Sequence, residues 1–115
     1  MTIKRLHVGP RMSEAVVHNG TIYLAGQVAD DASQDTAGQT RQILSAIDAL
    51  LAECGSDKTR ILSAQIFLAD ISDFAAMNSA WDAWVPAGHT PARATVESKL
   101  AAAKYRVEVK VIAAA

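Results

Sequence analysis

In the segment from Tyr105 to Ala113 apolar residues alternate with Arg106, Glu108, Lys110 and Ile112, and this pattern constrains the fold strongly. Successive side chains of a β-strand point to opposite faces of a sheet. Val107, Val109 and Val111 are therefore expected to face a core, with Glu108 on the other face. A strand of this kind needs neighbours in a sheet and a layer that covers its apolar side, which predicts a layered domain.

A short strand precedes this segment and opens with an arginine, over residues 93–97. We expect the two strands to pair as a hairpin. In that hairpin Ala94 and Val96 match the core face, and Arg93 and Thr95 lie on the face of Glu108. The pattern thus predicts a guanidinium and a carboxylate on one side of a sheet, away from the core.

The other elements follow from apolar periodicity and from turn residues. Asn19-Gly20 is typical of a tight hairpin turn, and Gly55 is placed to end a helix. Asp70 or Ser72 can cap a later helix. The predicted elements are strands over 13–17, 21–28 and 60–68, a helix over about 36–54, and a second helix that carries Phe74, Met77, Trp81, Trp84 and Val85 and ends at Pro86.

Two helices and five or six strands predict an α+β fold in which both helices cover one face of the sheet. In the strand over 60–68, Leu62, Ala64, Ile66 and Leu68 are expected on the covered face. An exposed sheet face that mixes apolar residues with polar and charged ones indicates a surface for a partner, so we expect a homo-oligomer. The residues assigned to that second face are Tyr23, Ala25, Ile61, Ser63, Phe67, Gln65, Arg93, Glu108 and Ile112.

Length and charge restrict the classes of function. A chain of 115 residues is expected to form one domain, over 1–115. The net charge of −1 and the lack of a basic run argue against nucleic acid and against a polybasic membrane surface. No signal-peptide core or membrane-spanning run is found. A single cysteine, Cys54, cannot form an internal disulfide, which favours a reducing cytoplasm.

Metal and cofactor motifs are also missing from the sequence. His7, His18 and His89 have no ligand partner at helical or turn spacing, so no metal site is expected. There is no glycine-rich phosphate loop and no nucleophile elbow. We therefore expect any activity to proceed without a metal or an organic cofactor.

Several segments of the chain form an ordered set of motifs: Gly9-Pro10, 19–28, 39–44, 73–78, 91–96 and 107–113. In this order they resemble the Rid/YjgF family of reactive-intermediate imine deaminases. The resemblance implies a chorismate-mutase-like fold with a mixed sheet, a homotrimer, and active sites in the clefts between subunits. It also implies a small carboxylate substrate.

In this family an arginine at the position of Arg93 anchors the substrate carboxylate, and the resemblance implies the same role here. A guanidinium suits a carboxylate because it binds both oxygens at once. Glu108 matches a glutamate that can activate a water for attack on the imine carbon. The alternatives are structural: an ion pair of Arg93 with Glu108 or Glu97, and a surface glutamate balanced by Arg106 and Lys110.

Four further residues are candidate substrate contacts by the same resemblance. The N–H of Gly26 can bind a substrate oxygen, unless the glycine only forms a bulge. Asn78 matches a family asparagine, or is a helix-surface amide. Thr95 stands where the family often has a cysteine. Met12 or Trp84 can supply the surface of the aromatic residue that usually follows Gly-Pro.

The leading hypothesis is hydrolytic deamination of small 2-imino and 2-enamino acids to 2-oxo acids and ammonia. The alternative is a non-catalytic trimer that binds small carboxylates and has a regulatory or protective role. Two departures keep it open: Arg11-Met12 replaces the family's tyrosine, and Ala25 replaces a serine. A third hypothesis, an RNA-cleaving translation inhibitor, is disfavoured by the charge.

Overall fold

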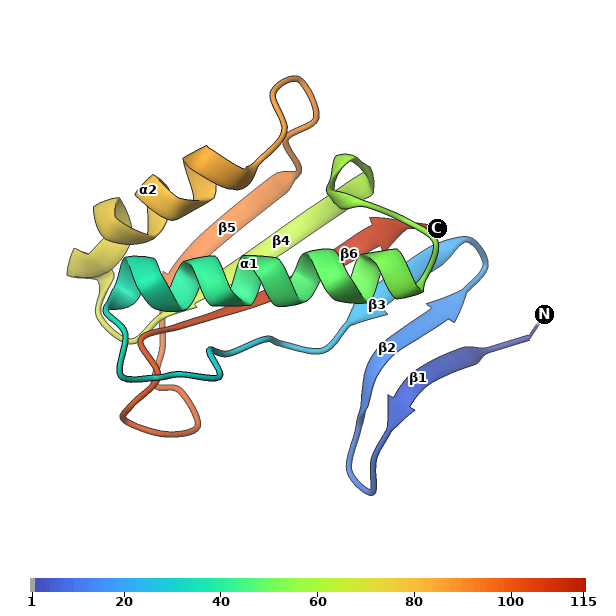
Figure 1. Cartoon of the computed structure of the whole chain (residues 1–115), viewed down its shortest axis with the longest axis horizontal. Coiled ribbons are helices and arrows are strands. Elements are labelled where there is room, and N and C mark those ends of the chain that lie inside the picture. The colour runs from blue at the N-terminus through green and yellow to red at the C-terminus, as the bar shows by residue number, and fades with distance from the viewer. Residues whose placement is uncertain (1) are drawn as a thin grey trace.

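The structure, a computed structural model that describes residues 2–115, is one six-stranded sheet with two helices on one of its faces (Figure 1). The strand order is β1-β2-β3-β6-β4-β5. The β4–β5 pair is parallel and the other pairs are antiparallel. The predicted α+β layer is therefore confirmed, with a mixed sheet. The elements are β1 (Lys4–Val8), β2 (Ser13–His18), β3 (Thr21–Leu24), α1 (Thr36–Glu53), β4 (Ile61–Leu68), α2 (Phe74–Trp84), β5 (Ala92–Glu97) and β6 (Val107–Ala114), with 3₁₀ turns at Lys58–Arg60 and Ile71–Asp73.

The first hairpin is confirmed at its turn. Asn19 and Gly20 have φ angles of 52° and 75°, the left-handed conformation that a two-residue hairpin turn requires. β3 is shorter than the predicted strand over 21–28, because regular pairing stops at Leu24. Further on, Gln27 forms a single isolated bridge with Val109. The sequence did not predict β1, which pairs with β2 at the edge of the sheet.

Both predicted helices are present and end where the sequence indicates. The side chain of Asp35 accepts a hydrogen bond from the Gly38 N–H at 2.8 Å and caps α1. Gly55, with φ 73°, follows the other end. Asp70 caps the short turn that leads into α2, and Pro86 lies just beyond it. Neither α1 nor α2 is long and apolar enough to cross a membrane.

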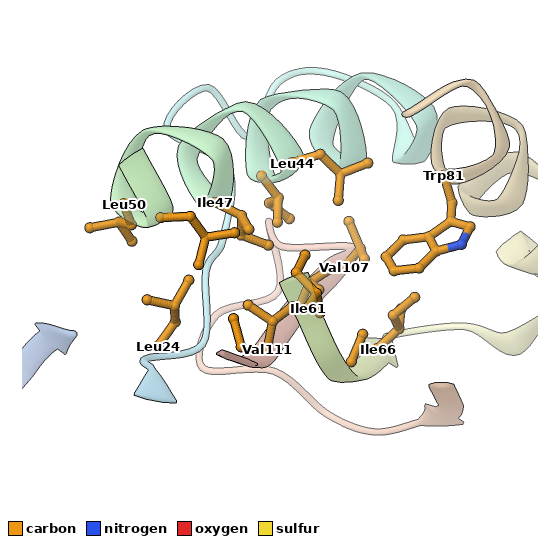
Figure 2. Packing of buried hydrophobic residues seen from close by; sticks show 14 of the residues in the cluster. Leu24, Leu44, Ile47, Leu50, Ile61, Ile66, Trp81, Val107 and Val111 are labelled. Carbon is orange, nitrogen blue, oxygen red and sulfur yellow. The ribbon is translucent and has the colours of Figure 1, made fainter. Parts of the chain in front are cut away.

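The core lies between the helices and the covered face of the sheet, as Figure 2 shows. The stripe of α1 that includes Leu44 and Ile47 packs over Val107 and Val111 of β6, and all four are buried. Burial of each such side chain contributes about 1.5–3 kcal/mol. The alternation predicted for β6 is thus confirmed: Val107, Val109, Val111 and Ala113 are all buried.

The start of β4 contradicts the predicted alternation. A register irregularity between Ile61 and Ser63 turns Ile61 into the core, where it is 5% exposed, and leaves Leu62 53% exposed. A bulge adds one residue to a strand and reverses which side chains face inward from that point. Ala64, Ile66 and Leu68 do face the core as expected. The open face, meaning the sheet face that neither helix covers, therefore carries Leu62 and not Ile61.

The predicted hairpin between the last two strands is wrong. β4 lies between β5 and β6 and pairs with both, so the two strands are not neighbours. The segment 98–106 joins them across the end of β4, where the Ser98 N–H donates to the Leu68 carbonyl. Figure 1 shows this crossover as the orange-red loop below the sheet.

A single buried glutamine fixes that crossover. The amide nitrogen of Gln39 donates to the carbonyls of Ala32, Gln34 and Lys104 at 3.1–3.2 Å. Its oxygen accepts from the Arg106 N–H at 2.9 Å. Because Gln39 is fully buried, these bonds compensate for the cost of removing its amide from water. Gln39 therefore ties the start of α1 to the segment that leads into β6.

Candidate functional site

Arg93 lies on β5, the edge strand, and its side chain is on the helix side of the sheet. Its register partner on β4 is Ala64, and that of Thr95 is Ile66; both partners face the core. Paired residues of neighbouring strands point to the same face. The prediction that Arg93 and Thr95 share a face with Glu108 is therefore wrong. The reason is that β5 is an edge strand whose apolar residues, Ala92, Ala94 and Val96, lie on the open face, so its alternation does not identify the side that the helices cover.

Helix α2 surrounds the guanidinium of Arg93. Its Nη1 donates to Asn78 Oδ1 at 2.8 Å. Its Cζ lies 5.2 Å from the centre of the Trp81 ring and 5.8 Å from that of Phe74. These separations are within the range of cation–π attraction. Three side chains of one helix thus hold one half-buried cation.

The structural alternative for Arg93 has no support in the geometry. Within residues 2–115 the ion pairs are His7–Glu53 and Arg106–Asp73, and Arg93 is in neither. Glu97, the alternative partner, accepts a hydrogen bond from the Ile71 N–H instead. The guanidinium is therefore oriented by a neutral amide and two rings, and its positive charge is not balanced by a carboxylate.

Thr95 lies two residues along β5 on the same face as Arg93. Its Oγ1 is buried and has no hydrogen-bond partner within the part of the chain that the structure describes. A buried hydroxyl without a partner costs about 1–3 kcal/mol. A ligand or water beside Arg93 that bonds this hydroxyl would recover that free energy.

Glu108 lies on the open face, next to Gly26. Its register partner on β4 is Phe67, which also faces away from the helices. A Cβ at position 26 would overlap the Glu108 carboxylate oxygen Oε2. The lack of a side chain at Gly26 therefore leaves room for the Glu108 carboxylate in its present position. The expected role of the Gly26 N–H as a substrate contact stays a prediction.

A second carboxylate lies close to the same glycine. The side-chain amide of Gln27 donates to Glu14 Oε2 at 2.9 Å and to the Ala25 carbonyl at 3.1 Å. Glu14 is half-buried on β2. Two carboxylates, Glu14 and Glu108, thus flank the short segment 25–27 after β3. Sequence reasoning did not single out Glu14 or the role of Gln27.

The candidate residues form two groups in one chain. Arg93, Asn78 and Thr95 lie together where α2 covers β5, and Gly26 and Glu108 lie together at β6. Met12 is in neither group: it is 51% exposed in the β1–β2 turn, at the opposite edge of the sheet. Trp84, the other suggested substitute for the missing aromatic residue, donates its indole N–H to Asp48 of α1.

Phe74 and Trp81 are the contacts of Arg93 that sequence reasoning did not identify. The sequence pattern placed both residues on the second helix and gave them no role beside Arg93. The spacing of Phe74, Asn78 and Trp81, at i, i+4 and i+7, places them on one side of a helix. That spacing could have indicated their common role beside the arginine.

A metal site, a reactive thiol and a nearby hollow are three other features that could contribute to a functional site. No three His, Cys, Asp or Glu side chains converge as a metal site within residues 2–115. Cys54 is at the end of α1, and burial raises the pKa of its thiol, so it remains protonated at neutral pH. The hollow of about 480 Å³ beside Asp35, Lys104 and Arg106 has neither Arg93 nor Glu108 in its lining.

Comparison with known proteins gives matches over nearly the whole chain. A family model described as Endoribonuclease L-PSP matches residues 2–115. RutC family protein YoaB of Escherichia coli is 52% identical over 114 residues, which cover 99% of each chain. The crystal structure of NMB1025, a YjgF family member from Neisseria meningitidis, has a TM-score of 0.97 at 51% identity and covers 99% of this chain and 95% of its own. A 2-iminobutanoate/2-iminopropanoate deaminase of Rattus norvegicus is 31% identical over 107 residues, 88% of this chain and 77% of its own length.

Proposed function

This chain belongs to the Rid/YjgF family, whose model matches it from residue 2 to residue 115, and on that premise we propose that it is a deaminase. The reaction is the hydrolysis of small 2-imino and 2-enamino acids to 2-oxo acids and ammonia, with no cofactor. The deaminase named among the relatives, from rat, supports this class of reaction at 31% identity.

The observation that carries the proposal is the environment of Arg93. A guanidinium held by an amide and two rings, and in no ion pair with a carboxylate of residues 2–115, has its charge free for a ligand. Because it can bind both oxygens of a carboxylate, it is suited to a 2-imino acid. The buried hydroxyl of Thr95 on the same face provides a further donor for that carboxylate.

Glu108 activates the water in the proposed reaction. It takes a proton from the water as the oxygen attacks C2 of the imine, and passes that proton to the imine nitrogen. The resulting tetrahedral carbon carries a hydroxyl and an amino group. Glu108 then transfers the hydroxyl proton to the amino nitrogen, the C–N bond breaks to release ammonia, and the C2 oxygen becomes the carbonyl of the 2-oxo acid. Gly26 contributes by leaving space for the carboxylate.

The two groups come together in a homotrimer with a chorismate-mutase-like arrangement. Arg93 is on the helix side at the β5 edge, and Glu108 is on the open face, so one chain does not join them. The open face carries exposed apolar side chains, including Tyr23, Leu62 and Val96, which supports its burial between subunits. Each site then combines Arg93 of one subunit with Glu108 of the partner subunit.

A non-catalytic trimer that binds small carboxylates is the second candidate function. It is favoured by Ala25, which lacks a hydroxyl beside Gly26, and by the absence of an aromatic residue at positions 11 and 12. It uses Arg93 and does not use Glu108. The family description also names a ribonuclease, but the net charge of −1 gives this chain no general attraction for RNA.

An ammonia-release assay tests the proposal. Imines are generated in place by an amino-acid oxidase from several amino acids, and ammonia formation is followed with and without the protein. The deaminase proposal requires an acceleration that depends on Arg93 and Glu108. Saturable binding of 2-oxobutanoate with no acceleration for any imine would reject the deaminase and support the binding trimer.

A further inference from the structure

A hollow lies on the outer side of the helical layer, between α1 and α2. Its volume is about 270 Å³. The buried side chains of Leu44 and Ala80 form its floor, and exposed residues of both helices form its rim. Arg93 is not part of it, because Arg93 contacts α2 through Phe74, Asn78 and Trp81.

The indole of Trp84 forms one wall of the hollow and is fixed in place. Its Nε1–H donates to Asp48 Oδ2 of α1 at 2.9 Å. Lys58 donates from Nζ to the Trp84 carbonyl at 2.8 Å, and the same Nζ lies 5.2 Å from the ring centre. The ring also packs against Trp81, at 5.4 Å between centres. A wall held on several sides needs little rearrangement to accept a ligand.

Two positive side chains line this apolar hollow. The side chain of Arg41 makes no hydrogen bond or ion pair with any residue in the range 2–115. Lys58 bonds only a neutral carbonyl. The carboxylate of Asp48 accepts a hydrogen bond from the Trp84 indole N–H. It does not line the hollow. An apolar floor beside unbalanced positive charge is complementary to an amphipathic anion.

We propose that this hollow is a second ligand site, which binds a small monocarboxylate with an apolar body. The body lies on Leu44, Ala80 and Ala83 against the face of Trp84, and the carboxylate meets Arg41 and Lys58 at the rim. The volume is slightly below the range of about 300–1,000 Å³ for drug-sized ligands, which restricts the occupant to a smaller molecule. The site does not depend on the proposed deaminase activity.

Phenylacetate is the probe for a direct test by NMR of the whole, assembled protein. The chain has two tryptophans, so two indole N–H signals can be followed: Trp84 lines the hollow, and Trp81 lies beside Arg93. Titration should shift the Trp84 signal to saturation. The neutral analogue 2-phenylethanol should bind more weakly, by about 2- to 30-fold, the range for loss of two exposed ion pairs. The cation 2-phenylethylamine should bind weakest.

Variants separate this site from the one at Arg93. Ala83→Leu should fill the hollow and abolish the Trp84 shift, and Arg41→Glu should weaken binding by at least about threefold. Lys99→Glu, the same charge reversal on an exposed loop residue, is the matched control and should keep wild-type affinity. Arg93→Gln should also leave the Trp84 titration unchanged, since Arg93 does not line the hollow.

The opposite results overturn the inference. A Trp84 shift that disappears in Arg93→Gln would mean that phenylacetate binds only at Arg93. Equal affinities for the acid, the alcohol and the amine would mean that the positive rim does not recognise the ligand. An unchanged titration in Ala83→Leu would mean that the hollow is not where the ligand lies.

Discussion

Arg93 and Glu108 have contrasting surroundings, although the proposed reaction needs both. Arg93 is held by Asn78 and lies against two aromatic rings, all from α2. Glu108 makes no side-chain hydrogen bond or ion pair with residues 2–115, and it shares the open face with Phe67. The orientation of the arginine is therefore determined within one folded chain, whereas the contacts of the glutamate remain to be made.

This difference suggests that carboxylate binding by Arg93 depends on contacts within one chain, whereas water activation by Glu108 depends on a partner. Binding of a carboxylate at Arg93 uses contacts that are already formed, and preorganisation reduces its cost. Activation of water by Glu108 requires a partner to enclose the open face, because a general base must be close to its proton donor and substrate. Variants should therefore separate binding from turnover.

Glu108→Gln should give the largest effect. Replacing the carboxylate by an amide removes the general base and should lower kcat by about 10²–10⁴-fold. The affinity for 2-oxobutanoate should stay close to that of the wild type, because Arg93, and not Glu108, binds its carboxylate. Stopped assays of ammonia release and calorimetric titration measure the two quantities. Wild-type turnover in this variant would show that another group activates the water.

Arg93→Ala should impair binding and turnover together. Removing one member of an enclosed charge pair costs about 2–5 kcal/mol, which is a loss of at least roughly 30-fold in kcat/KM. Arg93→Lys should recover only part of it, because an ammonium cannot bind both oxygens in the same geometry. Light scattering should show an intact assembly. If the variants unfold or dissociate, the role of Arg93 is structural.

Asn78 tests the orientation of the guanidinium. Asn78→Ala removes one hydrogen bond, worth about 1 kcal/mol or roughly fivefold in kcat/KM. Asn78→Asp places a carboxylate at the same position, gives Arg93 a permanent partner, and should reduce substrate affinity further. Ser79→Ala, on the same helix but away from Arg93, is the control. Equal rates for Asn78→Asp and wild type would mean that the asparagine does not control the arginine.

Mixed assemblies test whether the two groups meet between subunits. Arg93→Ala and Glu108→Gln chains are unfolded together, mixed equally and refolded. If each site joins two subunits, random trimers should regain about a quarter of the wild-type sites. If each site lies in one chain, the mixture should be no more active than the separate variants. Size-exclusion chromatography confirms that the assembly has re-formed.

Local patterns in the sequence were sufficient for much of the fold. The stripe that includes Leu44 and Ile47, the Asn19-Gly20 turn and the alternation of Val107 to Val111 each correspond to the observed element. Such signals depend on residues close together in the chain. Arg93 and Asn78 were identified as candidate residues by the family resemblance, and the structure brings them together.

What the sequence could not provide was the pairing of distant strands. The parallel β4–β5 pair joins Ala64 to Arg93 across an intervening helix, and no short-range pattern encodes it. The hairpin prediction failed for this reason, and with it the face assigned to Arg93. Leu62 was misplaced by a bulge, which shifts the alternation by one residue without a clear change in composition.

The position of β6 has a consequence for how the protein is made. β6 lies between β3 and β4 in the sheet, yet it is the last of these six strands to leave the ribosome. Until it does, the edges of β3 and β4 are unpaired and the apolar side of α1 has lost a main partner surface. Unpaired edges and uncovered apolar surface favour aggregation in incomplete chains. The sheet is therefore completed only after β6 has left the ribosome, and a nascent chain that lacks residues 107–114 has no continuous sheet to fold into.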